Sequence, residues 1–189
     1  MGLLLTPDPA PAAWVTRFVP LLRPGGTVLD LACGSGRHTR ELAARGFAVS
    51  AVDRDAEAVA PLKACAEVIV ADIEAGPWPL PGRRFDGILV TNYLWRPLLP
   101  RIAEALADGG VLIYETFAQG QETIGRPSRP EFLLAPGELL QAFEGLRVVA
   151  FEDGFEHPPA PAAPRFVQRL AAVRPDAAEP PGKLARFPL

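Results

Sequence analysis

The sequence predicts an α/β fold in which helices cover both faces of a mostly parallel sheet. Short apolar runs alternate with helix-like segments along most of the 189 residues. This alternation is typical of parallel strands joined by crossover helices. Near the end of the chain, two apolar runs follow each other without a helix between them. They predict an antiparallel hairpin at one edge of a seven-stranded sheet.

The first elements follow from apolar periodicity and from the position of the glycines. Residues 10–22 are expected to form an amphipathic helix that covers the domain. A strand is expected at 27–31, followed by a helix at 37–45 that Gly46 ends. The apolar face of the covering helix contains Trp14, Val15, Phe18, Val19 and Leu22.

Two further strands are each followed by an acidic residue. The strand at 47–52 reaches Asp53, and the strand at 67–71 reaches Asp72. Between them, Asp55 is the expected N-cap of a helix that Pro61 shortens.

The second half of the chain continues the same pattern. Its expected elements are a strand at 85–91, a helix from Arg96 with Gly109 past its end, a strand at 111–115, a long polar loop at 117–135, a helix at 136–145 and strands at 146–151 and 166–173.

The length predicts a single domain over residues 1–175 and a tail at 176–189. A net charge of −3 argues against general binding of nucleic acid, which usually needs a basic surface. No apolar stretch is long enough to span a bilayer. The start at Met1-Gly2 matches the loose pattern for N-myristoylation but does not resemble a signal peptide.

The two cysteines, Cys33 and Cys65, do not form a metal-binding or disulfide pattern. We therefore expect no metal site and a reducing, cytoplasmic location. Cys33 is expected to be a small apolar filler in a tight turn, and Cys65 to lie in the core.

The most informative segment is Asp30-Leu-Ala-Cys-Gly-Ser-Gly36, where a strand passes into a helix. Glycines in such a turn let a ligand lie against bare backbone, and the helix N-terminus favours an anionic group. The outline is that of a cradle for a nucleotide-type cofactor.

The strand-end acids distinguish between two such cofactors. Asp53 is placed to accept both hydroxyls of a ribose, and Asp72 with Ile73 suits the edge and face of an adenine. A dinucleotide site would have a small third residue in its glycine motif, but Thr39 stands there. Asp30 is poorly placed beside a pyrophosphate and well placed beside an ammonium. S-adenosylmethionine fits these acids better than a dinucleotide.

Over residues 10–173 the chain resembles the class I S-adenosylmethionine-dependent methyltransferases, and among them the small tellurite-resistance-type methyltransferases. The residues that carry the resemblance are Asp30 to Thr39, Ala48 to Asp53, Asp72-Ile73, Asn92-Tyr93 and Gly109 to Phe117. The resemblance implies a three-layer Rossmann-like fold.

The resemblance also implies roles for individual residues. The backbone of Gly34 to Gly36 and the Asp30 carboxylate would hold the methionine portion, Asp53 the ribose, and Asp72 with Ile73 the adenine. Asn92 and Tyr93 would lie beside the sulfonium, with Tyr93 the one candidate catalytic side chain. Ala32, Ser35, His38 and Arg54 complete the expected cofactor site.

One position departs from the family pattern, which is D-x-G-x-G-x-G. Ala32 stands where the first glycine is usual. Because alanine disfavours a positive φ, we expect ordinary backbone angles at Ala32.

Several polar residues have two possible interpretations, one functional and one merely structural. His38 either approaches the methionine carboxylate or packs its helix, and His157 is either a base or an exposed loop residue. Arg126, Arg129 and Arg165 either bind an anionic substrate or are simply solvated. Trp95 is expected to be a packing residue.

The expected function is methyl transfer to a small molecule, such as a thiol, a chalcogen oxyanion or a small acid. A general base is needed only for a protonated nucleophile, and the sequence shows no compact group of a base and a residue that would orient it. Two alternatives stay open: a non-catalytic module that binds S-adenosylmethionine, and an NAD(P)-dependent oxidoreductase. The sequence does not indicate an oligomeric state.

Overall fold

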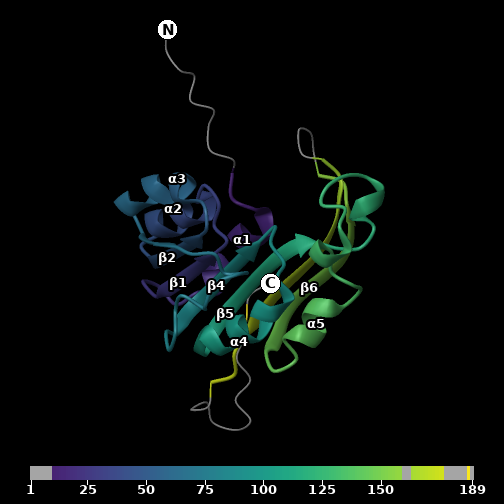
Figure 1. Ribbon diagram of the computed structural model, residues 1–189. Coiled ribbons are helices and arrows are strands. Elements are labelled where there is room, and N and C mark those ends of the chain that lie inside the picture. Colours follow the sequence, from purple (N-terminus) through teal and green to yellow (C-terminus); the bar gives the residue numbers. More distant parts are fainter. Residues whose placement is uncertain (1–9, 159–162, 177–186, 188–189) are drawn as a thin grey trace.

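The computed structural model describes residues 10–158, 163–176 and 187. Within these residues seven strands form one sheet in the order β3-β2-β1-β4-β5-β7-β6 (Figure 1). Neighbouring strands are parallel except at β7, which is antiparallel to both β5 and β6. The strands are β1 (Thr27–Leu31), β2 (Ala48–Asp53), β3 (Glu67–Val70), β4 (Phe85–Thr91), β5 (Leu106–Phe117), β6 (Arg147–Glu156) and β7 (Arg165–Val173). This arrangement confirms the predicted fold class and its C-terminal hairpin.

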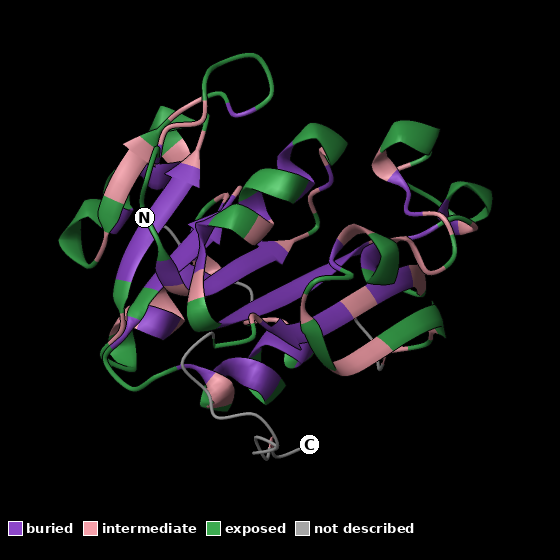
Figure 2. Ribbon diagram, turned by 90° about the horizontal axis from the view of Figure 1, so that it is seen from below, coloured by how far each residue is buried: buried purple, intermediate pink, exposed green. Residues whose placement is uncertain are grey.

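The helices form a layer on each face of the sheet. Side chains alternate between the two faces of a strand, so neighbouring residues such as Val28 and Leu29 belong to different core clusters. One face packs against α1 (Ala13–Phe18) and α2 (Arg37–Ala44), and the other against α4 (Leu99–Ala105) and α5 (Glu138–Ala142). Figure 2 shows the buried strands between helices whose outer surfaces are exposed.

The short elements complete these layers. The helix α3 (Ala56–Val59) is capped by the Asp55 carboxylate, as expected, and Pro61 converts its continuation into a 3-10 turn. The 3-10 turns are η1 (Val19–Leu21), η2 (Ala60–Ala64), η3 (Arg96–Leu98), η4 (Gln121–Thr123) and η5 (Pro130–Phe132).

The N-terminal covering helix is confirmed, although it is shorter than expected. It consists of α1 and the turn η1, and the predicted face of Trp14, Val15, Phe18, Val19 and Leu22 is buried. The Trp14 indole nitrogen donates to the carbonyl of Leu170 at 3.4 Å. This contact fixes the helix against β7.

Several boundaries differ from the expected ones, and β6 extends to Glu156 rather than ending at residue 151. The strand β5 begins at Leu106 rather than at residue 111, so Gly109 and Gly110 lie within it. A Cβ at Gly110 would stand 2.9 Å from the Phe85 carbonyl, which is why the close pairing with β4 needs glycine there. The helix α5 is only Glu138–Ala142, because Gly137 before it has a φ of +71°.

Cys65 was expected in the core, and this expectation is wrong. Its side chain is exposed at the end of η2, and its thiol points to the Leu62 carbonyl. The N-terminal pattern at Met1-Gly2 and most of the tail at 176–189 lie outside the described residues. From the tail, Phe187 packs against the core cluster beneath α1, with the Arg147 guanidinium over its ring.

The sheet topology determines where a ligand can bind. The chain fills the sheet outward from β1 toward β3 and then crosses to β4 on the other side of β1. Such a reversal leaves a crevice at the carboxyl ends of the two central strands. None of the described helices is long and apolar enough to cross a membrane.

Candidate active site

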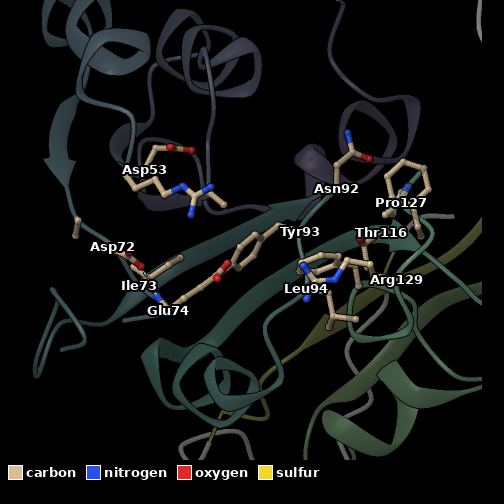
Figure 3. A pocket seen from close by; sticks show the side chains of 15 residues that line it. Asp53, Asp72, Ile73, Glu74, Asn92, Tyr93, Leu94, Thr116, Pro127 and Arg129 are labelled. Carbon is tan, nitrogen blue, oxygen red and sulfur yellow. Dashed lines mark hydrogen bonds between the residues drawn. The ribbon is translucent and has the colours of Figure 1, made fainter. Parts of the chain in front are cut away.

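A cavity of about 580 Å³ opens at the carboxyl ends of β1, β2, β4 and β5. Its size lies in the range of small-molecule sites. Figure 3 shows Asp53, Asp72, Ile73 and Glu74 on one side of it and Asn92, Thr116, Pro127 and Arg129 on the other. The lining also includes Ala32, Arg54, Ala71, Tyr93, Leu94, Phe117 and Phe132.

The turn between β1 and α2 reaches the cavity at Ala32, two residues before Gly34. Gly34 has a φ of +56°, and a Cβ built there would have no atom within 4 Å. A ligand can therefore approach the bare backbone of Gly34. Gly36 is different, because its missing side chain makes room for Leu62 of η2, which a Cβ would meet at 2.4 Å.

The expectation of ordinary backbone angles at Ala32 is wrong. Its φ is +55°, in the left-handed region that glycine adopts without strain. Ala32 therefore takes the backbone conformation that the glycine of the family pattern would favour. The departure from the pattern changes the residue but leaves the turn intact.

The Asp53 carboxylate joins the glycine turn to the end of β2. Its Oδ2 accepts the Gly34 amide at 2.8 Å, and its Oδ1 accepts the Asp55 amide at 3.0 Å. A carboxylate has about four acceptor positions, so two stay open for a ligand. Asp53 is half-buried and lines the cavity.

The end of β3 supplies a polar and an apolar side chain in sequence. Asp72 is exposed, and its Oδ1 accepts the amides of Glu74 and Ala75 at 2.9 and 3.0 Å. These two hydrogen bonds lower the pKa of Asp72. Ile73 beside it is buried and offers an apolar surface to the cavity.

Tyr93 follows β4 and lies between the two sides of the cavity (Figure 3). Its hydroxyl is buried and makes no hydrogen bond of ordinary geometry within the described residues. Burial raises the pKa of the Tyr93 phenol above its usual range, and the nearby Glu74 carboxylate adds a smaller increase. The phenol therefore stays protonated at neutral pH and can donate a hydrogen bond but cannot act as a base. Its neighbour Asn92 has a φ of +54°, which turns the chain sharply after β4.

The segment after β5 covers the cavity and is fixed by Arg96. The Arg96 guanidinium forms two hydrogen bonds with Glu138, at 2.6 and 2.9 Å, and donates to the carbonyls of Glu131 and Leu133 at 2.9 Å each. This clamp holds the turn η5, which brings Phe132 to the cavity wall.

Some expected site residues lie outside the lining. Gly34, Ser35 and Gly36 form the turn behind Asp53, and Asp30 lies inside β1, 1% exposed. Asp30 accepts the Thr39 hydroxyl at 2.6 Å. Burial raises the pKa of the Asp30 carboxyl to about 6, against the lowering effect of Thr39.

His38 is also outside the cavity lining. Its Nε2 accepts the Ala12 amide at 3.1 Å, and its Nδ1 lies 3.4 Å from the Thr91 hydroxyl. Burial lowers the pKa of His38 to about 4. These contacts match the helix-packing role that the sequence left open.

The remaining candidates are placed as follows. Cys33 is buried, and burial raises the pKa of its thiol to about 12, so it is an inert filler as expected. His157 is exposed and packs edge-on against the ring of Phe155. Trp95 packs against the core, also as expected. Among the described residues, no group of three or more acids, histidines or cysteines is arranged to hold a metal ion.

Sequence reasoning missed several residues of the lining. Thr116 and Phe117 directly end β5, so the rule that sites collect at strand ends would have found them. Glu74, Leu94, Pro127 and Phe132 belong to loops for which the sequence contains no such signal.

The strand order, and the acid at the end of β2 that holds the glycine turn, are the features expected of the class I methyltransferase fold. In agreement, residues 28–110 match the family model of a methyltransferase domain. By this match and by its fold, the chain resembles the class I S-adenosylmethionine-dependent methyltransferases, and among them the TehB-like proteins.

Solved structures show the same fold at low sequence identity. TehB from Haemophilus influenzae is 18% identical with a TM-score of 0.71; the match covers 85% of this chain and 61% of that one. A TehB-like S-adenosylmethionine-dependent methyltransferase from Corynebacterium glutamicum is 21% identical with a TM-score of 0.60, over 85% and 86% of the two chains. A further S-adenosylmethionine-dependent methyltransferase, from Methanosarcina mazei, is 15% identical with a TM-score of 0.68, over 89% and 100%. The chain thus spans less than two thirds of the Haemophilus protein. No curated protein matches it in sequence.

Proposed function

We propose that the protein transfers a methyl group from S-adenosylmethionine to a small-molecule acceptor. The observation that carries this proposal is the position of Asp53. Its carboxylate lies at the end of β2, holds the glycine turn through Gly34 and still lines the cavity with acceptor positions open.

The residues of the cavity fit the cofactor. The bare backbone of Gly34, in the turn that reaches the cavity at Ala32, is proposed to contact its amino-acid portion, while Asp53 can accept its ribose hydroxyls. Ile73 provides an apolar surface for the adenine, with Asp72 at its edge. Asp30, behind the turn, is proposed to supply charge for the cofactor ammonium.

The cofactor supplies a methyl group already activated by its sulfonium, so the chain mainly has to orient the acceptor. Positioning of this kind accounts for roughly 7–11 kcal/mol of barrier reduction. Tyr93 and Asn92, beside the crevice, are the side chains proposed to do so. Because the Tyr93 phenol stays protonated, its role is to donate a hydrogen bond.

The dimensions of the site favour a small acceptor. The cavity of about 580 Å³ must hold both cofactor and acceptor. The segment fixed by Arg96 lies over it and contributes Pro127, Arg129 and Phe132 to its wall. We expect a cytoplasmic enzyme acting on a thiol, a chalcogen oxyanion or a small acid.

The first test is calorimetry with S-adenosylhomocysteine and NADH side by side. We expect S-adenosylhomocysteine alone to bind, and Asp53→Ala to weaken its binding by about 10- to 100-fold, the value of a charge-assisted hydrogen bond. Asp108→Ala removes an exposed acid paired with Arg174 and should leave the affinity unchanged. Binding of NADH instead would overturn the proposal in favour of an oxidoreductase.

The second test is methyl transfer from labelled cofactor to a panel of thiols, chalcogen oxyanions and small organic acids. Label in at least one acceptor supports the enzyme. Tight cofactor binding without transfer to any acceptor would instead indicate a non-catalytic binding module.

A further inference from the structure

A second cavity, of about 390 Å³, shares Phe117 with the cofactor cavity. It is lined by Ala12, Arg37, Glu115, Phe117, Gln121, Arg126, Pro158, Ala163, Pro164 and Arg165. A third, more open hollow shares Phe117 and Arg126 with it. That hollow shares Phe117, Pro127, Arg129 and Phe132 with the cofactor cavity. The three spaces therefore adjoin one another around Phe117.

Two arginines of the second cavity stand out by their lack of direct partners, although the charge of Arg37 acts on the buried Asp30 carboxyl and lowers its pKa. Arg37 begins α2, and Arg126 lies in the segment after η4. Within the described part of the chain, neither guanidinium has a hydrogen bond or ion pair. Most other arginines of the described ranges do have such partners, for example Arg96 with Glu138 and Arg169 with Glu115.

The one acid of the cavity does not cancel these charges. Glu115 is fully buried, and Arg169 holds its Oε2 at 2.5 Å. Arg165 lies 3.2 Å from its Oε1, which makes no hydrogen bond of ordinary geometry. Arg165 and Arg169 also pair with Glu156, and Arg169 and Arg17 pair with Glu152, so three arginines and three carboxylates balance one another in this network.

The net charge of the space is therefore positive, although the protein as a whole is acidic. Two guanidiniums with free donors can hold a carboxylate or phosphate by charge-assisted hydrogen bonds. The hollow that leads toward the cofactor cavity has apolar walls at Phe117, Pro127 and Phe132 and polar side chains at Arg126, Ser128 and Arg129.

We propose that the second cavity binds the anionic group of the methyl acceptor. The acceptor is then a small organic anion whose carboxylate or phosphate lies between Arg37 and Arg126. Its apolar body lies along Phe117 and Phe132 and carries the nucleophile to the cofactor cavity. This proposal rests on the proposed function, because it takes the first cavity as the cofactor site.

The test measures binding in the presence of saturating S-adenosylhomocysteine, so it does not depend on turnover. Benzoate is compared with benzamide, and phenyl phosphate with phenol, by calorimetry. We expect at least one of the two anions to bind about 10-fold or more tightly than its neutral partner. The preferred anion distinguishes a carboxylate from a phosphate acceptor.

Variants locate the binding. Arg126→Ala and Arg37→Gln should each lower the affinity for the preferred anion by about 10-fold. Arg126→Ala should leave the affinity for S-adenosylhomocysteine unchanged. Arg84→Ala is the matched control, since Arg84 is exposed and lines a different hollow. It should change neither affinity.

Two results would overturn the inference. One is that neither anion binds better than its neutral partner. The other is that Arg126→Ala and Arg84→Ala behave alike. If S-adenosylhomocysteine itself fails to bind the wild-type protein, the proposed function fails instead, and the two failures are distinguishable in the same titration.

Discussion

Ala32 is held in a backbone conformation that its side chain opposes. Its φ of +55° lies in the left-handed region, which costs a residue with a Cβ roughly 1–2 kcal/mol. Glycine removes this strain but adds entropy to the unfolded chain, which offsets about 0.4–1 kcal/mol. We expect Ala32→Gly to raise the free energy of unfolding by about 1 kcal/mol, measured by urea denaturation.

Gly34 provides the matched control in the same turn. It has a similar φ of +56° and free space where a Cβ would stand. Gly34→Ala should therefore lower stability by about 1 kcal/mol through the backbone alone. Loss of stability in Ala32→Gly would show that the alanine side chain contributes more by packing than its conformation costs.

At the scale of single residues, the sequence predicted side chains at strand ends better than side chains within strands. Asp53 ends β2, Asp72 lies just after β3, and both line the cavity. Asp30 lies one residue before the end of β1, and its side chain points to Thr39 of α2 instead. The positive φ of Ala32 was missed because alanine usually avoids it, and only the requirement of the turn overrides that preference.

At the scale of elements, the first turn of α2 contains His38 and contacts Asp30 through Thr39. The contributions of these two buried groups to stability depend on pH with opposite sign. Asp30 has its pKa raised to about 6, so the stability it contributes is full below about 3.8 and is lost as pH rises through 6. His38 has its pKa lowered to about 4, so its contribution is full above 6.5 and is lost as pH falls through 4. Each shift corresponds to roughly 3 kcal/mol.

These opposed slopes predict a nearly flat stability curve for the wild type between pH 4 and 6. In Asp30→Asn only the His38 slope is left, so stability should fall on acidification from 6.5 to 4. In His38→Gln only the Asp30 slope is left, so stability should rise over the same range. Denaturation at several pH values measures both, and parallel curves for the two variants would contradict the linkage.

The differences in element boundaries have a common cause. Glycine was interpreted as a terminator at Gly109, but the strand continues through it, and the next residue, Gly110, lets the strand pass close to Phe85. At α5, proline was interpreted as a helix start, but the helix begins two residues later, after the left-handed Gly137. Whether a glycine ends an element or allows close approach depends on tertiary neighbours, which one sequence does not reveal. Pro61 was predicted correctly because its effect on a helix is local.

At the scale of the whole molecule, the site is assembled from segments far apart in the sequence. The cavity wall extends from Ala32 to Phe132, and only the strand order brings these residues together. Alternation of strands and helices makes the crevice predictable, since parallel strands all end at one edge. The segment after β5 that covers the cavity was predicted only as a loop. Its position depends on the ion pair of Arg96 with Glu138, two residues that are 42 positions apart in the sequence.

Because the cavity exists only in the folded sheet, its ligand should stabilise the entire domain. A ligand that binds the native state alone adds about 2.7 kcal/mol when present at 100 times its Kd. For a chain of 189 residues this corresponds to a rise in Tm of about 5–10 °C. We expect S-adenosylhomocysteine to produce this rise in scanning calorimetry and NADH to produce none.

Variants test whether the ligand binds at the end of β2. At the same S-adenosylhomocysteine concentration, the ligand should stabilise Asp53→Ala by only about 0.4–1.4 kcal/mol, since its Kd is 10- to 100-fold weaker. Asp108→Ala, whose acid lies away from the cavity, should keep the full rise. Equal shifts in all three proteins would place the ligand away from the end of β2 and contradict the site.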